Sequence, residues 1–142
     1  MIVVLDASVV LKWLLADPVR EPDTDKAVAV MQSVVQGKIR ILQPLHWLVE
    51  AAAVMARLSP RNALQDVGML SAMQLPVCDE PAVLQRAIAL GIETGQHLFD
   101  TLYHAVALEN EGALLVTADA RYCEKAGHHG GILPLRDAGR LI

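Results

Sequence analysis

Short runs of aliphatic residues alternate along the chain with longer segments in which apolar residues recur every three or four positions. The runs predict buried strands and the longer segments predict amphipathic helices. The predicted strands are residues 2–5, 39–44, 76–78, 113–117 and 132–135. The predicted helices are residues 9–14 with Ser8 as N-cap, 27–35 ended by Gly37, 45–58, 60–75 with Pro60 in the first turn, 81–90 ended by Gly91, 97–110 ended by Gly112, and 119–125 capped by Asp119. This order predicts a three-layer α/β/α domain with helices on both faces of a central, mostly parallel sheet of four to five strands.

Composition narrows the class of protein. The chain has 142 residues, of which 54% are hydrophobic, so we expect one folded domain over residues 1–142 and exclude disorder. Asp6 and Glu50 interrupt the longest apolar runs, which leaves no segment of the roughly 20 residues that a membrane helix needs. The N-terminal run lacks the basic start of a secretory signal, so we expect a cytoplasmic protein. Cys78 and Cys123 have neither disulfide nor zinc spacing, which indicates small core residues.

Charge and aromatic content argue against a general nucleic-acid binder. Twelve Lys and Arg against sixteen Asp and Glu give a net charge of −4, and aromatic residues make up only 4%. A polyanion would therefore need a locally favourable site.

Four acidic residues stand out by their positions. Asp6 directly follows the first predicted strand, and Asp119 comes two residues after the end of the strand 113–117. In parallel α/β sheets, ligands bind beyond the carboxyl ends of the strands, where the strand order reverses. Glu50 and Asp100 interrupt helical faces that are otherwise apolar, which indicates that both face the protein. Each acid alone could be an ordinary cap or a surface residue, and the specificity lies in the combination.

Four carboxylates in one crevice repel one another. At about 4 Å and an effective dielectric constant near 20, each like-charged pair costs on the order of 4 kcal/mol. All-oxygen ligation favours Mg²⁺ or Mn²⁺ as the neutralising ion. Metals held in this way act on phosphate esters.

The ordered set of acids resembles the PIN domain family. The resemblance rests on Asp6-Ala7-Ser8 after the first strand, a helical Glu50, Asp100 followed by Tyr103, and Val116-Thr117-Ala118-Asp119 followed by Tyr122, and it covers essentially the whole chain. PIN domains of this size are similar to VapC-type toxins of toxin–antitoxin pairs, which are Mg²⁺-dependent ribonucleases. The resemblance therefore implies an endoribonuclease with an RNA substrate and an antitoxin partner.

The resemblance also assigns roles to individual residues. It makes Asp6, Glu50, Asp100 and Asp119 the metal-binding catalytic acids, with Ser8 and Thr117 as polar supports beside them. Many relatives carry a further acid or Asn near the last aspartate, where this chain has Ala118, Ala120 and Arg121. The choice between one and two metal ions stays open. Two divalent ions would bring the formal charge of the four carboxylates from −4 to 0.

Cationic residues and histidines each have two interpretations. Lys12, Arg121 and Lys125 lie one or two turns into helices that start at the crevice, so they are candidate RNA-phosphate contacts or ordinary solvated residues. The pair His128-His129 is a loop segment or two metal ligands that lack a third. Three other histidines are interpreted as helix-end or surface residues, and both tryptophans as core residues; these are His46, His97, His104, Trp13 and Trp47.

The predicted helical hairpin from Leu45 to Leu75 carries more apolar side chains than a small domain can bury, which predicts a homodimer whose surface also binds the antitoxin. These side chains are Leu48, Val54, Met55, Leu58, Leu64, Val67, Met69, Leu70 and Met73.

Two alternative functions remain open. One is a PIN-like RNA-binding module without catalysis, and the other is a metal-dependent phosphatase of similar architecture. A haloacid-type phosphatase would have a second aspartate at position 8, where this chain has Ser8.

Overall fold

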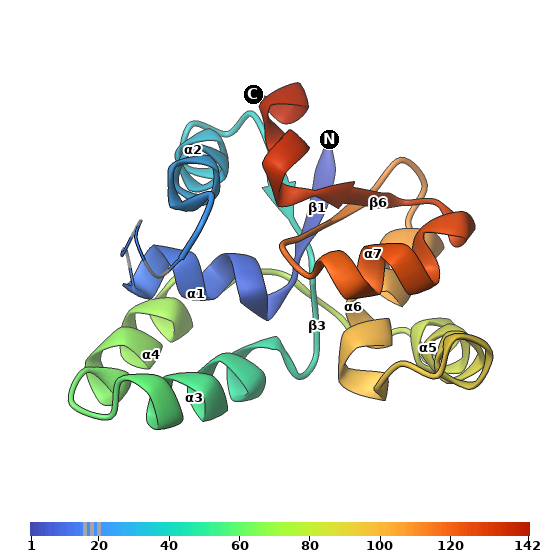
Figure 1. Ribbon diagram of the computed structural model, residues 1–142, viewed down its shortest axis with the longest axis horizontal. Coiled ribbons are helices and arrows are strands. Elements are labelled where there is room, and N and C mark those ends of the chain that lie inside the picture. The colour runs from blue at the N-terminus through green and yellow to red at the C-terminus, as the bar shows by residue number, and fades with distance from the viewer. Residues whose placement is uncertain (16, 18, 20) are drawn as a thin grey trace.

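A parallel sheet of four strands forms the centre of the molecule (Figure 1). The computed structural model describes residues 1–15, 17, 19 and 21–142. The strands lie in the order β2 (Arg40–Ile41), β1 (Ile2–Leu5), β5 (Leu114–Thr117) and β6 (Ile132–Pro134), and all neighbouring pairs are parallel. From β1 the chain proceeds to β2 on one side and returns later as β5 on the other, so the strand order reverses between β1 and β5.

Helices cover the sheet because its central strands are apolar on both faces. Val3, Val4 and Leu5 alternate between the faces of β1, and all three are fully buried. Both α1 (Ala7–Leu15) and α6 (Leu98–Glu109) pack on β1 and β5. Helix α2 (Thr24–Val35) packs on α1 and on the C-terminal 3-10 helix η2 (Leu135–Leu141). The predicted α/β class with a central parallel sheet is confirmed, with four strands in that sheet.

The remaining helices extend from this centre in two groups. Helices α3 (Trp47–Leu58) and α4 (Ala63–Ala72) pack together as the predicted hairpin, below α1 in Figure 1. Helix α5 (Pro81–Thr94) packs on α6, away from the hairpin, and near α7 (Ala120–Ala126). The short 3-10 helix η1 (Gly127–His129) follows α7 directly.

The predicted strand over residues 39–44 is wrong, because this segment divides between two sheets. Residues 40–41 form β2 in the central sheet, whereas β3 (Gln43–Pro44) pairs in parallel with β4 (Val77–Cys78). Leu42 lies between the two strands, and its N–H still donates to Val3 O at 3.0 Å. The N–H of the next residue, Gln43, donates to Pro76 O instead. The chain therefore changes partners within one residue.

Three predicted helix boundaries are also wrong. Residue 60 lies in a turn before α4, because the residue before a proline avoids the helical region and Asn62 N–H donates to Ser59 O at 3.1 Å. Gly91 lies inside α5, where a Cβ would come within 3.2 Å of Gln96 O, and the helix ends at Gly95 with φ +70°. Ser8 is not an N-cap, because α1 begins one residue earlier.

Several smaller expectations concern burial. Trp47 is a core residue, and Trp13 packs against the core from a partly buried position. Cys78 and Cys123 are both free and half-buried. Cys78 packs against the core, whereas Cys123 is not among the core residues. The first two helices are joined by an acidic loop that contains prolines, and one of these, Pro18, lies outside the described residues. No helix in the described ranges is long and apolar enough to cross a membrane.

Candidate metal centre

Asp6 lies where the strand order reverses, and backbone contacts on both sides hold it there. Its N–H donates to Val116 O of β5 at 3.2 Å. On the other side, the buried amide of Gln43 accepts from Leu5 N–H and donates to Leu5 O, each at 2.8 Å. This side chain substitutes for a neighbouring strand at the end of β1. The position of Asp6 is thus fixed by its two neighbours in the sheet.

Two hydroxyl groups orient the Asp6 carboxylate. Ser8 Oγ and Thr117 Oγ1 both donate to Asp6 Oδ2, at 2.9 and 2.7 Å. The same hydroxyls accept from the backbone of the turn after β5, Ser8 from Ala118 N–H and Thr117 from Asp119 N–H. Among the described residues, Asp6 Oδ1 receives no donor. One oxygen is therefore anchored and the other is available to a ligand.

Three of the four predicted acids converge. Ligand oxygens of Asp6, Glu50 and Asp100 all lie within 4.8 Å of one another. Asp119 lies outside this tight group, and its carboxylate accepts from Tyr122 N–H at 3.0 Å, as a helix N-cap does. All four acids nevertheless line one open cleft of about 440 Å³, which we call the acid cleft.

Each of the four acids also lies at the N-terminus of a helix. Asp6 immediately precedes α1 and Asp119 immediately precedes α7, while Glu50 and Asp100 lie in the first turns of α3 and α6. Helix N-termini carry a partial positive charge, which favours nearby carboxylates. The fold therefore offsets part of the repulsion that the four acids create.

The repulsion that remains is visible in the carboxyl groups themselves. Burial, followed by the charges of Asp6, Glu50 and Asp119, raises the pKa of Asp100 from 3.8 to about 6. Burial also raises the pKa of Asp6, against the lowering effect of its hydrogen bonds from Thr117 and Ser8. A divalent cation would remove this penalty, because it stabilises the ionised carboxylates.

Glu50 provides the test of whether these residues fit a metal ion. Its Oε2 is buried and makes no hydrogen bond of acceptable geometry among the described residues, although the Tyr103 hydroxyl interacts with this carboxylate. His46 Nε2 lies 3.0 Å away, but it also lies 2.8 Å from Phe99 O. Because a carbonyl oxygen can only accept, we assign the Nε2 proton to this second contact. A buried carboxylate oxygen without a hydrogen bond of acceptable geometry is the ligand that a hard cation requires, so the residues fit the ion.

Among the described residues, two cationic side chains line the acid cleft. Lys12 lines the cleft with a side chain only 6% exposed, and its Nζ lies 3.0 Å from Glu21 Oε2. The exposed Arg57 lies farther along the same wall. The other two predicted phosphate contacts, Arg121 and Lys125, are exposed on α7 and do not line the cleft.

From the sequence, Arg57 is not singled out, and Tyr103 supports the family resemblance without being given a role. Arg57 follows Glu50 by seven residues, a spacing that places two side chains on one face of a helix. Tyr103 follows Asp100 by three residues, and its buried hydroxyl interacts with the Glu50 carboxylate without a hydrogen bond of acceptable geometry in the described part of the chain. Burial and the charges of Glu50 and Asp6 raise the pKa of this tyrosine. Helical spacing from each acid is the signal that points to both.

The fold and the acid cleft together define a class of protein. Carboxylates at the switch point of a parallel sheet, with oxygen ligands free for a divalent cation, are typical of metal-dependent hydrolases of phosphate esters. The family model of the PIN domain matches residues 3–128, and the chain belongs to this family. PIN domains are generally metal-dependent nucleases. A search of curated proteins found no match to the chain.

Proposed function

We propose that the protein is an endoribonuclease that depends on Mg²⁺ or Mn²⁺ and hydrolyses RNA phosphodiester bonds in the acid cleft. The observation that carries the proposal is the convergence of oxygens from Asp6, Glu50 and Asp100 within 4.8 Å, with Asp119 on the same cleft. Membership of a family of metal-dependent nucleases supports it.

Each residue has a distinct part in this activity. Asp6, Glu50 and Asp100 would hold the cation, and Asp119 would complete the acidic wall. When bound, the cation would lower the pKa of a water so that its deprotonated form can attack phosphorus, and it would stabilise negative charge on the phosphate. Ser8 and Thr117 keep Asp6 in position through their hydrogen bonds.

The cationic wall would bind the substrate. Arg57 is exposed at the cleft and can form a forked pair of hydrogen bonds with a phosphate. Lys12 lies beneath the surface of the cleft, and Glu21 offsets part of the charge of its ammonium group. Neither residue reads a base, so both contacts favour a polyanion without selecting its sequence.

The VapC-like toxin role and its antitoxin partner extend this proposal. Apolar side chains exposed on the α3–α4 hairpin support an association surface, with Leu64 at 93% and Met69 at 54% exposed. Met69 also lines an apolar groove of about 380 Å³ with Trp13 and Met31. A homodimer through the hairpin would place two acid cleft regions beside one groove, where an antitoxin segment with a basic side chain could reach the acids.

The test is cleavage of structured RNAs by untagged protein, with Mg²⁺ or Mn²⁺ and with a chelator. We expect metal-dependent cuts that Asp6→Asn reduces by roughly 100-fold or more, because it removes a ligand of the cation. Asp79→Asn is the matched control, since this exposed aspartate lies outside the acid cleft. Metal-independent cleavage, or equal activity of the two variants, would reject the nuclease assignment. Retained RNA binding without cleavage would favour the binding module, and release of phosphate from small monoesters would favour the phosphatase.

A further inference from the structure

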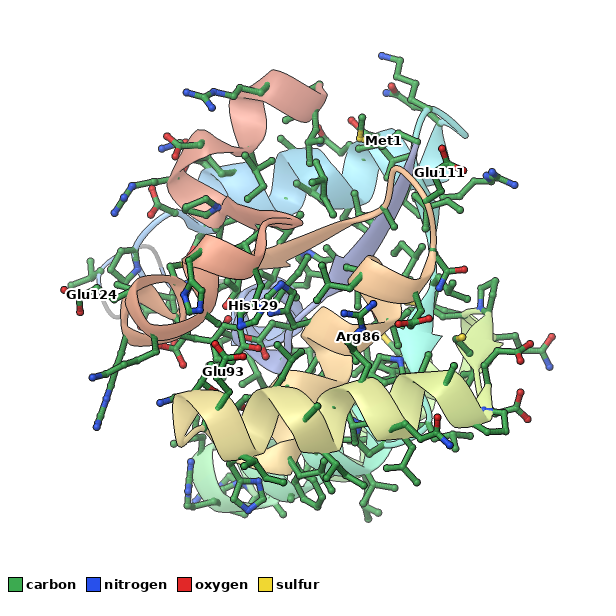
Figure 2. All side chains as sticks on the ribbon, turned by 90° about the vertical axis from the view of Figure 1, so that its right-hand side faces the viewer. Met1, Arg86, Glu93, Glu111, Glu124 and His129 are labelled. Atoms are coloured by element: carbon green, nitrogen blue, oxygen red, sulfur yellow. The ribbon has the colours of Figure 1, made fainter. Side chains whose placement is uncertain are left out.

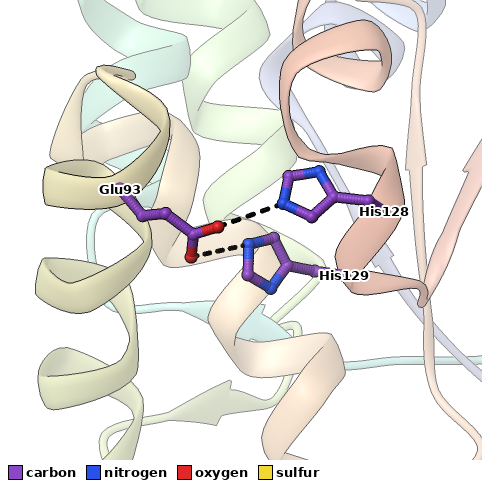
Figure 3. Close-up of side chains that lie close together, drawn as sticks. All are labelled: Glu93, His128 and His129. Carbon is purple, nitrogen blue, oxygen red and sulfur yellow. Dashed lines mark hydrogen bonds and ion pairs between the residues drawn. The ribbon is translucent and has the colours of Figure 1, made fainter.

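Two histidines and a glutamate meet on the surface outside the acid cleft (Figure 3). Glu93 lies in the last turn of α5, and His128 and His129 end η1. His128 Nε2 lies 3.1 Å from Glu93 Oε1, and His129 Nε2 lies 2.9 Å from Glu93 Oε2. We call these residues the Glu93–His128–His129 cluster. None of the three lines the acid cleft.

The structure supplies the third ligand that the sequence did not show. The histidine pair is adjacent in sequence, but Glu93 precedes it by 35 residues and comes from another helix. Figure 2 shows Glu93 on α5 facing His129 across the gap between α5 and η1. Ligands from two elements can join those elements, which a pair on one loop cannot do.

The histidine segment is anchored in the core rather than free on the surface. His104 of α6 is fully buried, so its interpretation as a helix-end or surface residue is wrong. Its Nε2 lies 2.7 Å from Gly130 O and its Nδ1 lies 2.9 Å from Tyr122 Oη. The carbonyl can only accept, so Nε2 carries the proton and Nδ1 accepts from the tyrosine. At Gly131 a Cβ would come within 3.2 Å of Leu108, so the backbone after η1 lies close to α6.

The donor atoms match the requirements of zinc. Tetrahedral ligands about 2.0–2.1 Å from Zn²⁺ stand roughly 3.3 Å from one another. One ligand atom from each of Glu93, His128 and His129 lies within 4.8 Å of the other two, so a small movement of the side chains would bring them to that spacing. Each imidazole is at present nearest to a different Glu93 oxygen, at 3.1 and 2.9 Å. His129 Nε2 is buried and makes no hydrogen bond of acceptable geometry within the described residues. Imidazole nitrogen with one carboxylate favours Zn²⁺ over Mg²⁺, which prefers oxygen ligands.

The Glu93 carboxylate is ready to bind a cation. The hydrogen bond from His128, together with the charges of both imidazoles, holds the pKa of Glu93 below its usual value. The carboxylate is an available anionic ligand, and both histidines would coordinate a metal in their neutral form. The competing interpretation of the geometry is a pair of surface ion pairs between Glu93 and protonated histidines.

We propose that the Glu93–His128–His129 cluster binds Zn²⁺ at a second metal site, separate from the acid cleft. Three protein ligands leave one coordination position for water. The ion joins the end of α5 to the segment after α7, and it stabilises the folded chain because the unfolded chain does not bring these ligands together.

The experiment uses the untagged, metal-free protein with Asp100→Asn, so that the acid cleft does not compete for the ion. Zn²⁺ is titrated at pH 7.5 by calorimetry, and thermal unfolding is followed at saturating Zn²⁺. We expect one ion per chain and a rise in Tm of roughly 5–10 °C at 100-fold excess over Kd. Mg²⁺ should produce no comparable rise in this background.

Single variants then assign the ligands. Glu93→Gln, His128→Gln and His129→Gln should each weaken Zn²⁺ binding at least about 10-fold, whereas Glu124→Gln, an exposed acid on α7, should leave it unchanged. X-ray absorption of the zinc-loaded protein should give nitrogen and oxygen ligands at about 2.0–2.1 Å. The absence of Zn²⁺-dependent stabilisation, a response that survives the ligand variants, or a Zn–S distance of about 2.3 Å from a cysteine would overturn the proposal. Glu93 and His128 are exposed, so circular dichroism of the metal-free variants should show an intact fold.

Discussion

The four acids of the cleft are each supported by a helix N-terminus, yet that support is smaller than the repulsion among them. A helix end stabilises a nearby carboxylate by about 0.3–1 kcal/mol, whereas a close pair of carboxylates costs several times more. Burial, followed by the charges of the other three acids, raises the pKa of Asp100 and favours its neutral form. The metal-free protein is therefore destabilised at neutral pH by the residues that would bind the ion.

This imbalance predicts a pH dependence of stability. In the folded protein the pKa of Asp100 is about 6, above its value in the unfolded chain, so between about pH 4 and 6 the folded state binds more protons. The free energy of unfolding of the metal-free protein should fall as pH rises through this window, by on the order of 2 kcal/mol after solvent screening. Above pH 6 the full loss is present. Thermal unfolding at pH 5 and pH 7 with a chelator measures the difference.

The Asp100→Asn variant isolates the source of this effect. At pH 7 without metal it should unfold about 5 °C higher than the parent, and it should lose most of the stabilisation by Mg²⁺. Asp79→Asn, at an exposed position, should change neither quantity. A lower Tm for Asp100→Asn would contradict the assigned repulsion.

At the residue scale, the sequence predicted which acids line the cleft better than it predicted the burial of other polar residues. Asp6 and Asp119 follow apolar strands, and Glu50 and Asp100 interrupt apolar helix faces, so local sequence carried these signals. The burial of His104 depends on contacts with residues 18 and 26 positions away in the chain. Such contacts arise from packing between distant segments, which periodicity does not encode.

At the scale of elements, the α3–α4 hairpin divides its apolar residues between two uses. Met55 and Leu70 are core residues, whereas Leu58, Leu64 and Met69 are exposed. The sequence predicted that the hairpin has an excess of apolar residues, but not which of them are buried. A rotation of either helix about its axis would change which face lies in the core and which faces solvent. The helix boundaries predicted at Pro60 and Gly91 are wrong for a related reason. Proline and glycine are common at helix ends, but contacts with neighbouring segments determine whether a helix begins or ends at a given one.

The exposed face of the hairpin predicts the effect of one substitution. Met69→Glu should convert the proposed dimer to a monomer, since a charge buried in an apolar interface is strongly unfavourable. Val35→Glu is the matched control, because Val35 is exposed at the end of α2 and does not line the groove that contains Met69. Light scattering at micromolar concentration measures the mass of each variant. If the parent is already monomeric, the hairpin is not a dimer interface.

For the whole molecule, the last two elements, β6 and η2, lie beyond the residues that the family model matches. The match stops at residue 128, yet β6 extends the sheet and η2 packs on α2. Leu133, Leu135 and Ala138 of these last elements are all buried. The C-terminal segment is therefore part of the core.

Deletion of residues 131–142 should abolish cooperative unfolding. Each buried leucine contributes about 1.5–3 kcal/mol, and a domain has only about 5–15 kcal/mol in total. Circular dichroism during heating measures the transition. Deletion of Ile142 alone, which is 56% exposed, should shift Tm by less than about 2 °C. A shortened chain that still melts cooperatively would show that the last strand is dispensable.

The contact between Thr117 and Asp6 joins residues 111 positions apart, and this separation has a consequence for protein synthesis. A ribosome adds about 5–20 residues per second, so roughly 6–22 s pass between the appearance of these two residues. During that time the nascent chain carries the first aspartate without the strand that orients it or the acid that follows that strand. Until Thr117 has been synthesised the acid cleft is incomplete, so we expect the nascent chain to lack the proposed nuclease activity up to that point.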